Sequence, residues 1–95
     1  MDPDRTPEAA VPRTGPRVLV VSPNRSHLAV LARRLSGEGY RIVAAENGAR
    51  ALTELSRTGA DLVLAELVME PMSGTDLARA IRGETGWSDL PVMLI

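Results

Sequence analysis

Two short apolar runs end at residues that bear on the chemistry this sequence could do. Ser22 and Pro23 follow RVLVV at residues 17–21, and Glu66 closes the run DLVLAE at residues 61–66. A carboxylate is a good oxygen ligand for a divalent cation, whereas a Ser hydroxyl is a weak ligand and Pro has no ligand side chain. The sequence therefore offers one carboxylate, Glu66, where a buried strand is expected to end.

These residues also have purely structural interpretations. Ser22 and Pro23 can start a helix, with Ser as the N-cap and Pro at the first helical position, and Asn24 is an alternative cap. Glu66 can be a solvated carboxylate at the end of a strand. Local sequence alone favours the helix start for Ser22 and Pro23 and the solvated carboxylate for Glu66.

Other reactive side chains are scarce. The sequence has no cysteine, which excludes disulfides, thiolate chemistry and Cys-based metal sites. His27 is the single histidine, and no Asp, Cys or second His stands beside it. We therefore expect His27 at the surface and predict no metal site around it.

Composition predicts one small globular domain. The chain has 95 residues, 44% of them hydrophobic, and a net charge of -1, so charge does not indicate nucleic acid as a partner. Residues 1–16 hold four of the seven prolines and few large apolar residues, which predicts a flexible tail. This segment does not resemble a signal peptide and no apolar run is long enough to span a bilayer, so we expect a cytoplasmic protein without membrane contact.

From residue 17 onward, predicted strands alternate with predicted helices. Strands are predicted at 17–21, 41–45 and 61–66, and the run VMLI follows Pro91. Helical spacing, caps and glycine stops predict three intervening helices, indicated by these residues: Leu28, Leu31, Ala32 and Leu35; Asn47, Gly48 and Gly59; Ser73, Asp76 and Gly83. This order predicts an α/β fold, a doubly wound parallel sheet of the flavodoxin-like type with helices on both faces.

Such sheets bind ligands at the carboxyl ends of their strands. In the flavodoxin-like order the binding crevice lies between the first and third strands. The first strand ends at Ser22 and Pro23, and the third ends at Glu66. The predicted fold therefore brings the candidate residues to one crevice.

Five segments in register make this chain resemble the receiver domain of two-component response regulators. They are VLVV in the first strand, EGY before the second, AENGARAL after it, DLVLAELVMEPMSG, and the closing LPVMLI. The resemblance covers residues 17–95 and implies a receiver-like domain. In that family an acidic pair follows the first strand, the third strand ends on the Asp that accepts a phosphoryl group, and later strands supply a Ser or Thr and a Lys.

Carried over by position, the acidic pair becomes Ser22 and Pro23, and the phosphoacceptor becomes Glu66. The resemblance thus implies a degenerate site with no catalytic residue, no cofactor and loss of Mg²⁺ binding. We expect a phosphorylation-independent signalling module, not an enzyme, that contacts a histidine kinase or a downstream effector and does not itself bind nucleic acid. Two alternatives stay open: a phosphoacceptor that uses Glu66 with altered metal binding, and another flavodoxin-like domain that binds a small cofactor.

The receiver fold continues beyond the elements found here. The resemblance implies a fourth helix, a fifth strand and a fifth helix after residue 95, a face that commonly carries dimerisation and output in the family. Without them a sheet edge and apolar surface would be exposed. We therefore expect either an N-terminal fragment of a longer product or a domain completed by another segment, and a dimer is a further expectation.

Overall fold

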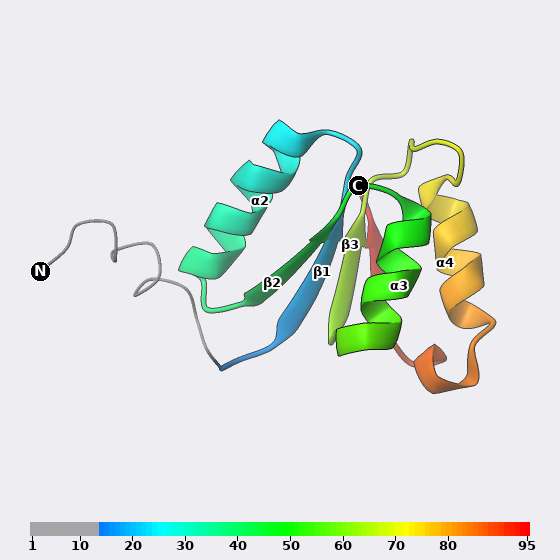
Figure 1. The fold of residues 1–95 in the computed structure, drawn as a ribbon. Coiled ribbons are helices and arrows are strands. Elements are labelled where there is room, and N and C mark those ends of the chain that lie inside the picture. The colour runs from blue at the N-terminus through cyan, green and yellow to red at the C-terminus, as the bar shows by residue number, and fades with distance from the viewer. Residues whose placement is uncertain (1–13) are drawn as a thin grey trace, which may run out of the picture.

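The computed structural model describes residues 14–95, which form one parallel four-stranded sheet (Figure 1). The strands are β1 (Arg17–Val21), β2 (Arg41–Ala45), β3 (Leu62–Ala65) and β4 (Val92–Leu94). Their order in the sheet is β2-β1-β3-β4, so β1 and β3 are neighbours at the centre although one strand and two helices separate them in sequence. The prediction of a doubly wound parallel sheet of the flavodoxin-like type is confirmed.

Helices cover both faces of this sheet. They are α2 (Arg25–Gly37), α3 (Gly48–Thr58) and α4 (Gly74–Arg82), and a short 3-10 helix, η2 (Thr85–Trp87), precedes β4. Figure 1 shows α2 on one side of the sheet, with α3 and α4 side by side on the other. Right-handed crossovers between parallel strands produce this layering.

The central strand β1 contributes to a separate core on each face. Val18 and Val20 are buried with Leu28 of α2, whereas Leu19 and Val21 join the larger cluster beneath α3 and α4. Successive side chains of a strand point to opposite faces, so a strand buried on both sides has an uninterrupted apolar sequence. This explains why VLVV, at residues 18–21, is a continuous apolar run.

The start of α2 corrects one prediction. Ser22 and Pro23 do not begin the helix: its N-cap is Asn24, whose side chain accepts a hydrogen bond from the backbone N–H of His27 at 3.0 Å. An N-cap needs extended backbone and a side chain aimed at the third amide of the helix, and Asn24 meets both conditions. Ser22 is thereby free for another contact.

The other two helix starts are confirmed. Asn47 caps α3 by accepting from the N–H of Arg50 at 2.8 Å. Ser73 and Asp76 form the predicted capping box at the start of α4. In both cases the cap and its partner are three residues apart, so local sequence is sufficient to specify them.

The ends of the described chain have different surroundings. The predicted flexible tail, residues 1–16, lies outside the described residues except at positions 14–16, where Gly15 and Pro16 accept hydrogen bonds from Arg41. At the other end β4 is an edge strand, and Met93 and Ile95 are about half exposed. Within residues 14–95 no helix is long and apolar enough to cross a membrane.

Gly74, the first residue of α4, yields a stability prediction. A Cβ atom at this position would collide with the carbonyl oxygen of Glu66 and lie 2.9 Å from Cα of Leu67. Because these are backbone atoms, they cannot move aside as a flexible side chain can. We expect Gly74→Ala to lower the free energy of unfolding by about 1–3 kcal/mol in urea denaturation, the usual scale of overpacking.

Gly37, the last residue of α2, supplies the matched control. A Cβ there would meet no atom within 4 Å. Gly37→Ala should therefore leave stability unchanged or raise it by up to about 1 kcal/mol. Equal destabilisation by both substitutions would contradict the close approach at Gly74.

Candidate functional site

The central pair of strands sets the position of the site. β1 and β3 run parallel with Val21 opposite Ala65, so the next residue of each strand leaves the sheet at the same edge. The backbone N–H of Glu66 still donates to the carbonyl of Val21 at 3.0 Å. Likewise the N–H of Ser22 donates to Ala45 of β2 at 3.0 Å, which fixes the backbone beneath both side chains.

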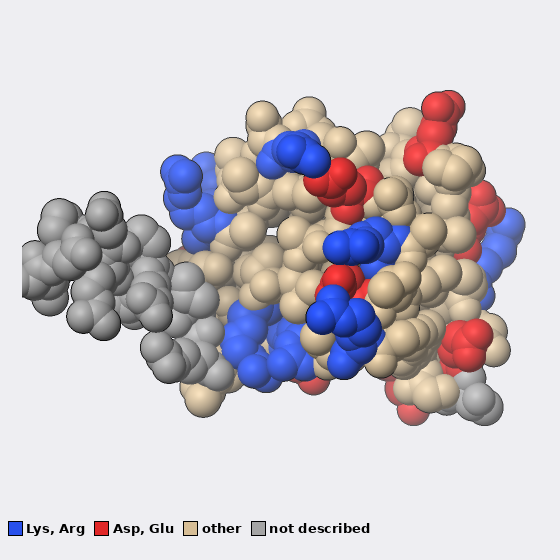
Figure 2. All heavy atoms as spheres, viewed as in Figure 1, with Lys and Arg blue, Asp and Glu red and all other residues tan. Residues whose placement is uncertain are grey.

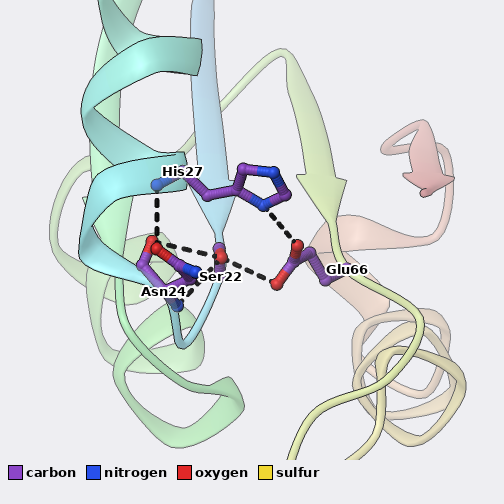
Figure 3. A network of polar contacts seen from close by, with 4 residues as sticks. All are labelled: Ser22, Asn24, His27 and Glu66. Atoms are coloured by element: carbon purple, nitrogen blue, oxygen red, sulfur yellow. Dashed lines mark hydrogen bonds and ion pairs between the residues drawn. The ribbon is translucent and has the colours of Figure 1, made fainter.

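Ser22 and Glu66 are in direct contact. The Ser22 hydroxyl donates to Oε2 of Glu66 at 2.7 Å and accepts from the backbone N–H of Asn24 at 3.1 Å (Figure 3). Ser22 is completely buried, whereas the Glu66 side chain is 19% exposed. A buried hydroxyl without a partner is costly, so this pair satisfies Ser22 as well as orienting the carboxylate.

His27 completes the network from the first turn of α2. Its Nδ1 lies 2.8 Å from Oε1 of Glu66, and Figure 3 shows the imidazole reaching across from the helix to the end of β3. The expected surface position of His27 is confirmed, since 60% of its side chain is exposed. The contact with Glu66 was missed, and Glu66 is not the freely solvated carboxylate that local sequence favoured.

A sequence signal for the His27 contact existed. The Asn24 cap places His27 at the third position of α2, where the helix begins directly above the end of β1. In the predicted strand order, that point faces the residue after β3. Metal-binding motifs consist of several ligands close together in the sequence. A single histidine whose carboxylate partner is 39 residues away does not match such a motif.

The surroundings of Glu66 favour its charged form. The hydroxyl of Ser22 is the largest influence that holds the pKa of Glu66 below its usual value of 4.5, because it donates to the carboxylate. Partial burial works in the opposite direction, and the hydrogen bond and charge of His27 lower the pKa further. Glu66 is therefore ionised at neutral pH.

The donor set does not fit Mg²⁺. This ion requires near-octahedral oxygen coordination, usually from carboxylates and waters. Pro23 has no donor atom in its side chain, and the Ser22 proton already points at Glu66. Both oxygens of Glu66 have protein partners, and residues 14–95 contain no cluster of three or more acidic, His or Cys side chains that could hold a metal ion.

This arrangement defines a class of protein. A parallel flavodoxin-like sheet with a carboxylate after its third strand is the architecture of receiver domains, and residues 18–95 match the family model of the response regulator receiver domain. The chain therefore belongs to the response regulator receiver domain family.

Individual relatives support the same family. Sensory transduction protein RegX3 of Mycobacterium bovis is 37% identical over 78 residues, which are 82% of this chain and 33% of the relative. The DNA-binding response regulator MtrA of Mycolicibacterium smegmatis is 33% identical over 79 residues, 83% of this chain and 33% of the relative. The chain thus spans about a third of the length of these relatives.

Solved structures agree on the fold. The N-terminal domain of a response regulator receiver protein from Methanoculleus marisnigri superposes with a TM-score of 0.82 at 32% identity, covering 85% of this chain and 66% of that one. Chemotaxis response regulator CheY4 of Vibrio cholerae gives 0.81 at 23% identity, covering 85% and 68%, and supports the fold alone. About a third of each solved chain has no counterpart here, so this sheet is incomplete relative to theirs.

The lowered pKa of Glu66 predicts a pH dependence of stability. A carboxyl that ionises more readily in the folded state than in the unfolded state stabilises the fold above its unfolded pKa. That stabilisation is lost as the pH falls below 4.5 and through the lower folded value. In urea unfolding from pH 7 to pH 3, the difference in free energy of unfolding between the unmodified protein and Glu66→Gln should therefore shrink toward acid.

The control for this titration is Glu38→Gln. Glu38 is an exposed carboxylate at the end of α2 with no hydrogen bond from its side chain to another described residue. Its substitution should give a nearly constant difference over the same range. A constant difference for Glu66→Gln as well would contradict the proposed role of Ser22 and His27.

Proposed function

We propose that this receiver domain is a signalling module that acts through protein contact and does not use Mg²⁺-dependent phosphorylation of Glu66. The observation that carries the proposal is the engagement of Glu66 by the protein itself: Ser22 donates to one oxygen and His27 lies at the other. Each oxygen has a partner within 2.8 Å that occupies one of its lone pairs, which makes it a weaker nucleophile than an uncontacted carboxylate oxygen.

The chemistry of transfer argues in the same direction. Phosphoryl transfer depends on positioning and on electrostatic stabilisation, in which a metal ion offsets charge on the transferred group. The site lacks the acidic pair that would hold the ion. Glu also carries its carboxylate one methylene farther than Asp, a displacement on the order of 1 Å that is costly where alignment matters.

A fixed charge is the property that remains. Glu66 bears one negative charge, whereas a phosphorylated acceptor brings nearly two. A permanent carboxylate is not switched off by hydrolysis, so a partner that recognises it does so constitutively. We propose a histidine kinase or a downstream effector as that partner, and we place the protein in the cytoplasm.

The charged surface supports a protein partner. Figure 2 shows acidic and basic side chains across the same face without one continuous basic surface. Ion pairs among the described residues include Arg57 with Glu54 at 3.0 Å and Arg25 with Glu46 at 2.9 Å. Binding to nucleic acid requires a concentration of unpaired positive charge, so this segment is not proposed to contact it.

Incubation with Mg²⁺ and acetyl phosphate tests the proposal directly. We expect intact mass to show no alkali-labile phosphoryl group on the unmodified chain, because an acyl phosphate on Glu66 would be lost in base. Glu66→Asp is the matched variant and should also stay unlabelled, since Pro23 still provides no ligand. An Mg²⁺-dependent, alkali-labile phosphoryl group at position 66 in either protein would overturn the proposal.

Metal binding offers a second, independent test. A ligand that binds only the folded state raises the thermal midpoint, so millimolar Mg²⁺ should leave the midpoint of the unmodified chain unchanged. The double variant Ser22→Asp with Pro23→Asp restores the acidic pair and should gain a small Mg²⁺-dependent rise. A rise in the unmodified chain that is lost in Glu66→Ala would show that the metal site is intact.

A further inference from the structure

We propose that the nucleophile of this site is the imidazole of His27, whose Nε2 accepts a phosphoryl group while Glu66 and Ser22 position the ring. The inference rests on the proposed function, in which Glu66 is hydrogen-bonded on both oxygens and is not the phosphoacceptor. It deepens that function by assigning the reactivity of the site to Nε2 of the neighbouring His27. It concerns small energy-rich phosphoryl donors of the phosphoramidate class.

The first support is the geometry of three groups in series. A nucleophile within hydrogen-bond reach of a base, with the base oriented by a third group, is the general signature of an activated side chain. Here His27 Nδ1 lies 2.8 Å from Glu66 Oε1, and the buried Ser22 hydroxyl holds Oε2 at 2.7 Å. Glu66 cannot turn away from His27 without breaking its bond to Ser22.

The second support is the choice of ring nitrogen. A carboxylate that accepts from Nδ1–H fixes the neutral tautomer in which Nε2 carries the lone pair. Figure 3 shows Nε2 on the side of the ring away from Glu66. Within residues 14–95 no hydrogen bond to Nε2 is found, and 60% of the side chain is exposed, so a donor in solution can reach it.

The third support is the place of His27 in the fold. It lies in the first turn of α2, a helix of 13 residues whose backbone dipoles favour negative charge at this end. The Asn24 cap fixes the backbone of His27 through a 3.0 Å hydrogen bond. A phosphoryl group on the imidazole would therefore be added where the helix stabilises an anion.

The transfer balances without a metal ion. The donor reacts in its N-protonated form, P–NH₃⁺, so as the Nε2 lone pair forms the N–P bond, the electron pair of the donor's own P–N bond leaves with neutral ammonia. The ring keeps its Nδ1 proton and becomes a phosphorylated imidazolium, whose positive charge Glu66 compensates across the existing contact. No oxidant, reductant or further proton donor is required.

The test is reaction of the full 95-residue chain with potassium phosphoramidate, followed by intact mass and by ³¹P and ¹⁵N NMR. Because His27 is the single histidine, any phosphohistidine is assigned without mapping. We expect one alkali-stable, acid-labile phosphoryl group, attached at Nε2 alone. Unfolding the chain in urea should slow its formation at least tenfold and give both ring isomers, since Nδ1 is then uncovered.

Variants distinguish positioning of the His27 ring by Glu66 and Ser22 from simple exposure of the ring as the cause of phosphorylation. Glu66→Gln should slow labelling about tenfold and lose selectivity for Nε2, while Ser22→Ala should have a smaller effect in the same direction. His27→Gln should abolish the alkali-stable label in a chain that is still folded. Far-UV circular dichroism of each variant identifies any that fail to fold, and Glu38→Gln is the neutral control.

Two results would overturn the inference. One is a rate of His27 phosphorylation and a ratio of Nε2 to Nδ1 product that are the same in the folded chain as in urea. This would mean that Glu66 and Ser22 do not position the imidazole. The other is attachment at Nδ1. An alkali-labile label at Glu66 in the separate acetyl phosphate experiment would instead refute the proposed function, so the two failures are distinguishable.

Discussion

One buried hydroxyl organises the functional end of this domain. Ser22 is completely buried at the end of the central strand β1, where a polar group without a partner would be costly. Its partner is supplied by the neighbouring strand β3, through the side chain of Glu66. Among the described residues no buried side-chain polar atom lacks a hydrogen bond, so this contact belongs to a fully satisfied interior.

The length of the Glu side chain suits this arrangement. Glu66 has to meet a buried hydroxyl on β1 with one oxygen and an exposed imidazole on α2 with the other. Asp would hold its carboxylate closer to the β3 backbone by about one carbon–carbon bond, so both contacts would lengthen together. The extra methylene that disfavours phosphoryl transfer thus favours a bridge between β1, β3 and α2.

Local and distant interactions differ in how far sequence can predict them. The caps at Asn47 and Ser73 bond to groups three residues away, so their spacing alone was sufficient. Ser22 and Glu66 are 44 residues apart, and only the predicted order of parallel strands brought them to one crevice. That order specifies which strand ends are neighbours but not which side-chain atoms touch.

The start of α2 shows why the N-cap and the contacts of Glu66 could not be predicted from local sequence. Ser, Pro and Asn all suit a helix start, and propensity ranked Ser22 with Pro23 above Asn24. The structure reverses this ranking. The Ser22 hydroxyl donates a hydrogen bond to Glu66, and Asn24 is the N-cap of the helix. His27, three residues after the cap, then contacts Glu66 from the first turn of α2, so two tertiary contacts to Glu66 lie at the boundary that local sequence had to predict.

In the network of Ser22, His27 and Glu66, negative charge and solvent exposure belong to different side chains, whereas an acceptor Asp combines both. Charge is held at Glu66, which is ionised, mostly covered and bonded on both oxygens. Exposure is found at His27, whose side chain is 60% exposed, against 19% for Glu66. A ligand or modification shifts a conformational equilibrium only by its differential affinity for the two states, and Glu66 presents the same charge in all of them at neutral pH. The fixed charge of Glu66 alone therefore cannot shift such an equilibrium at neutral pH, even though its side chain joins β3 to β1 and α2.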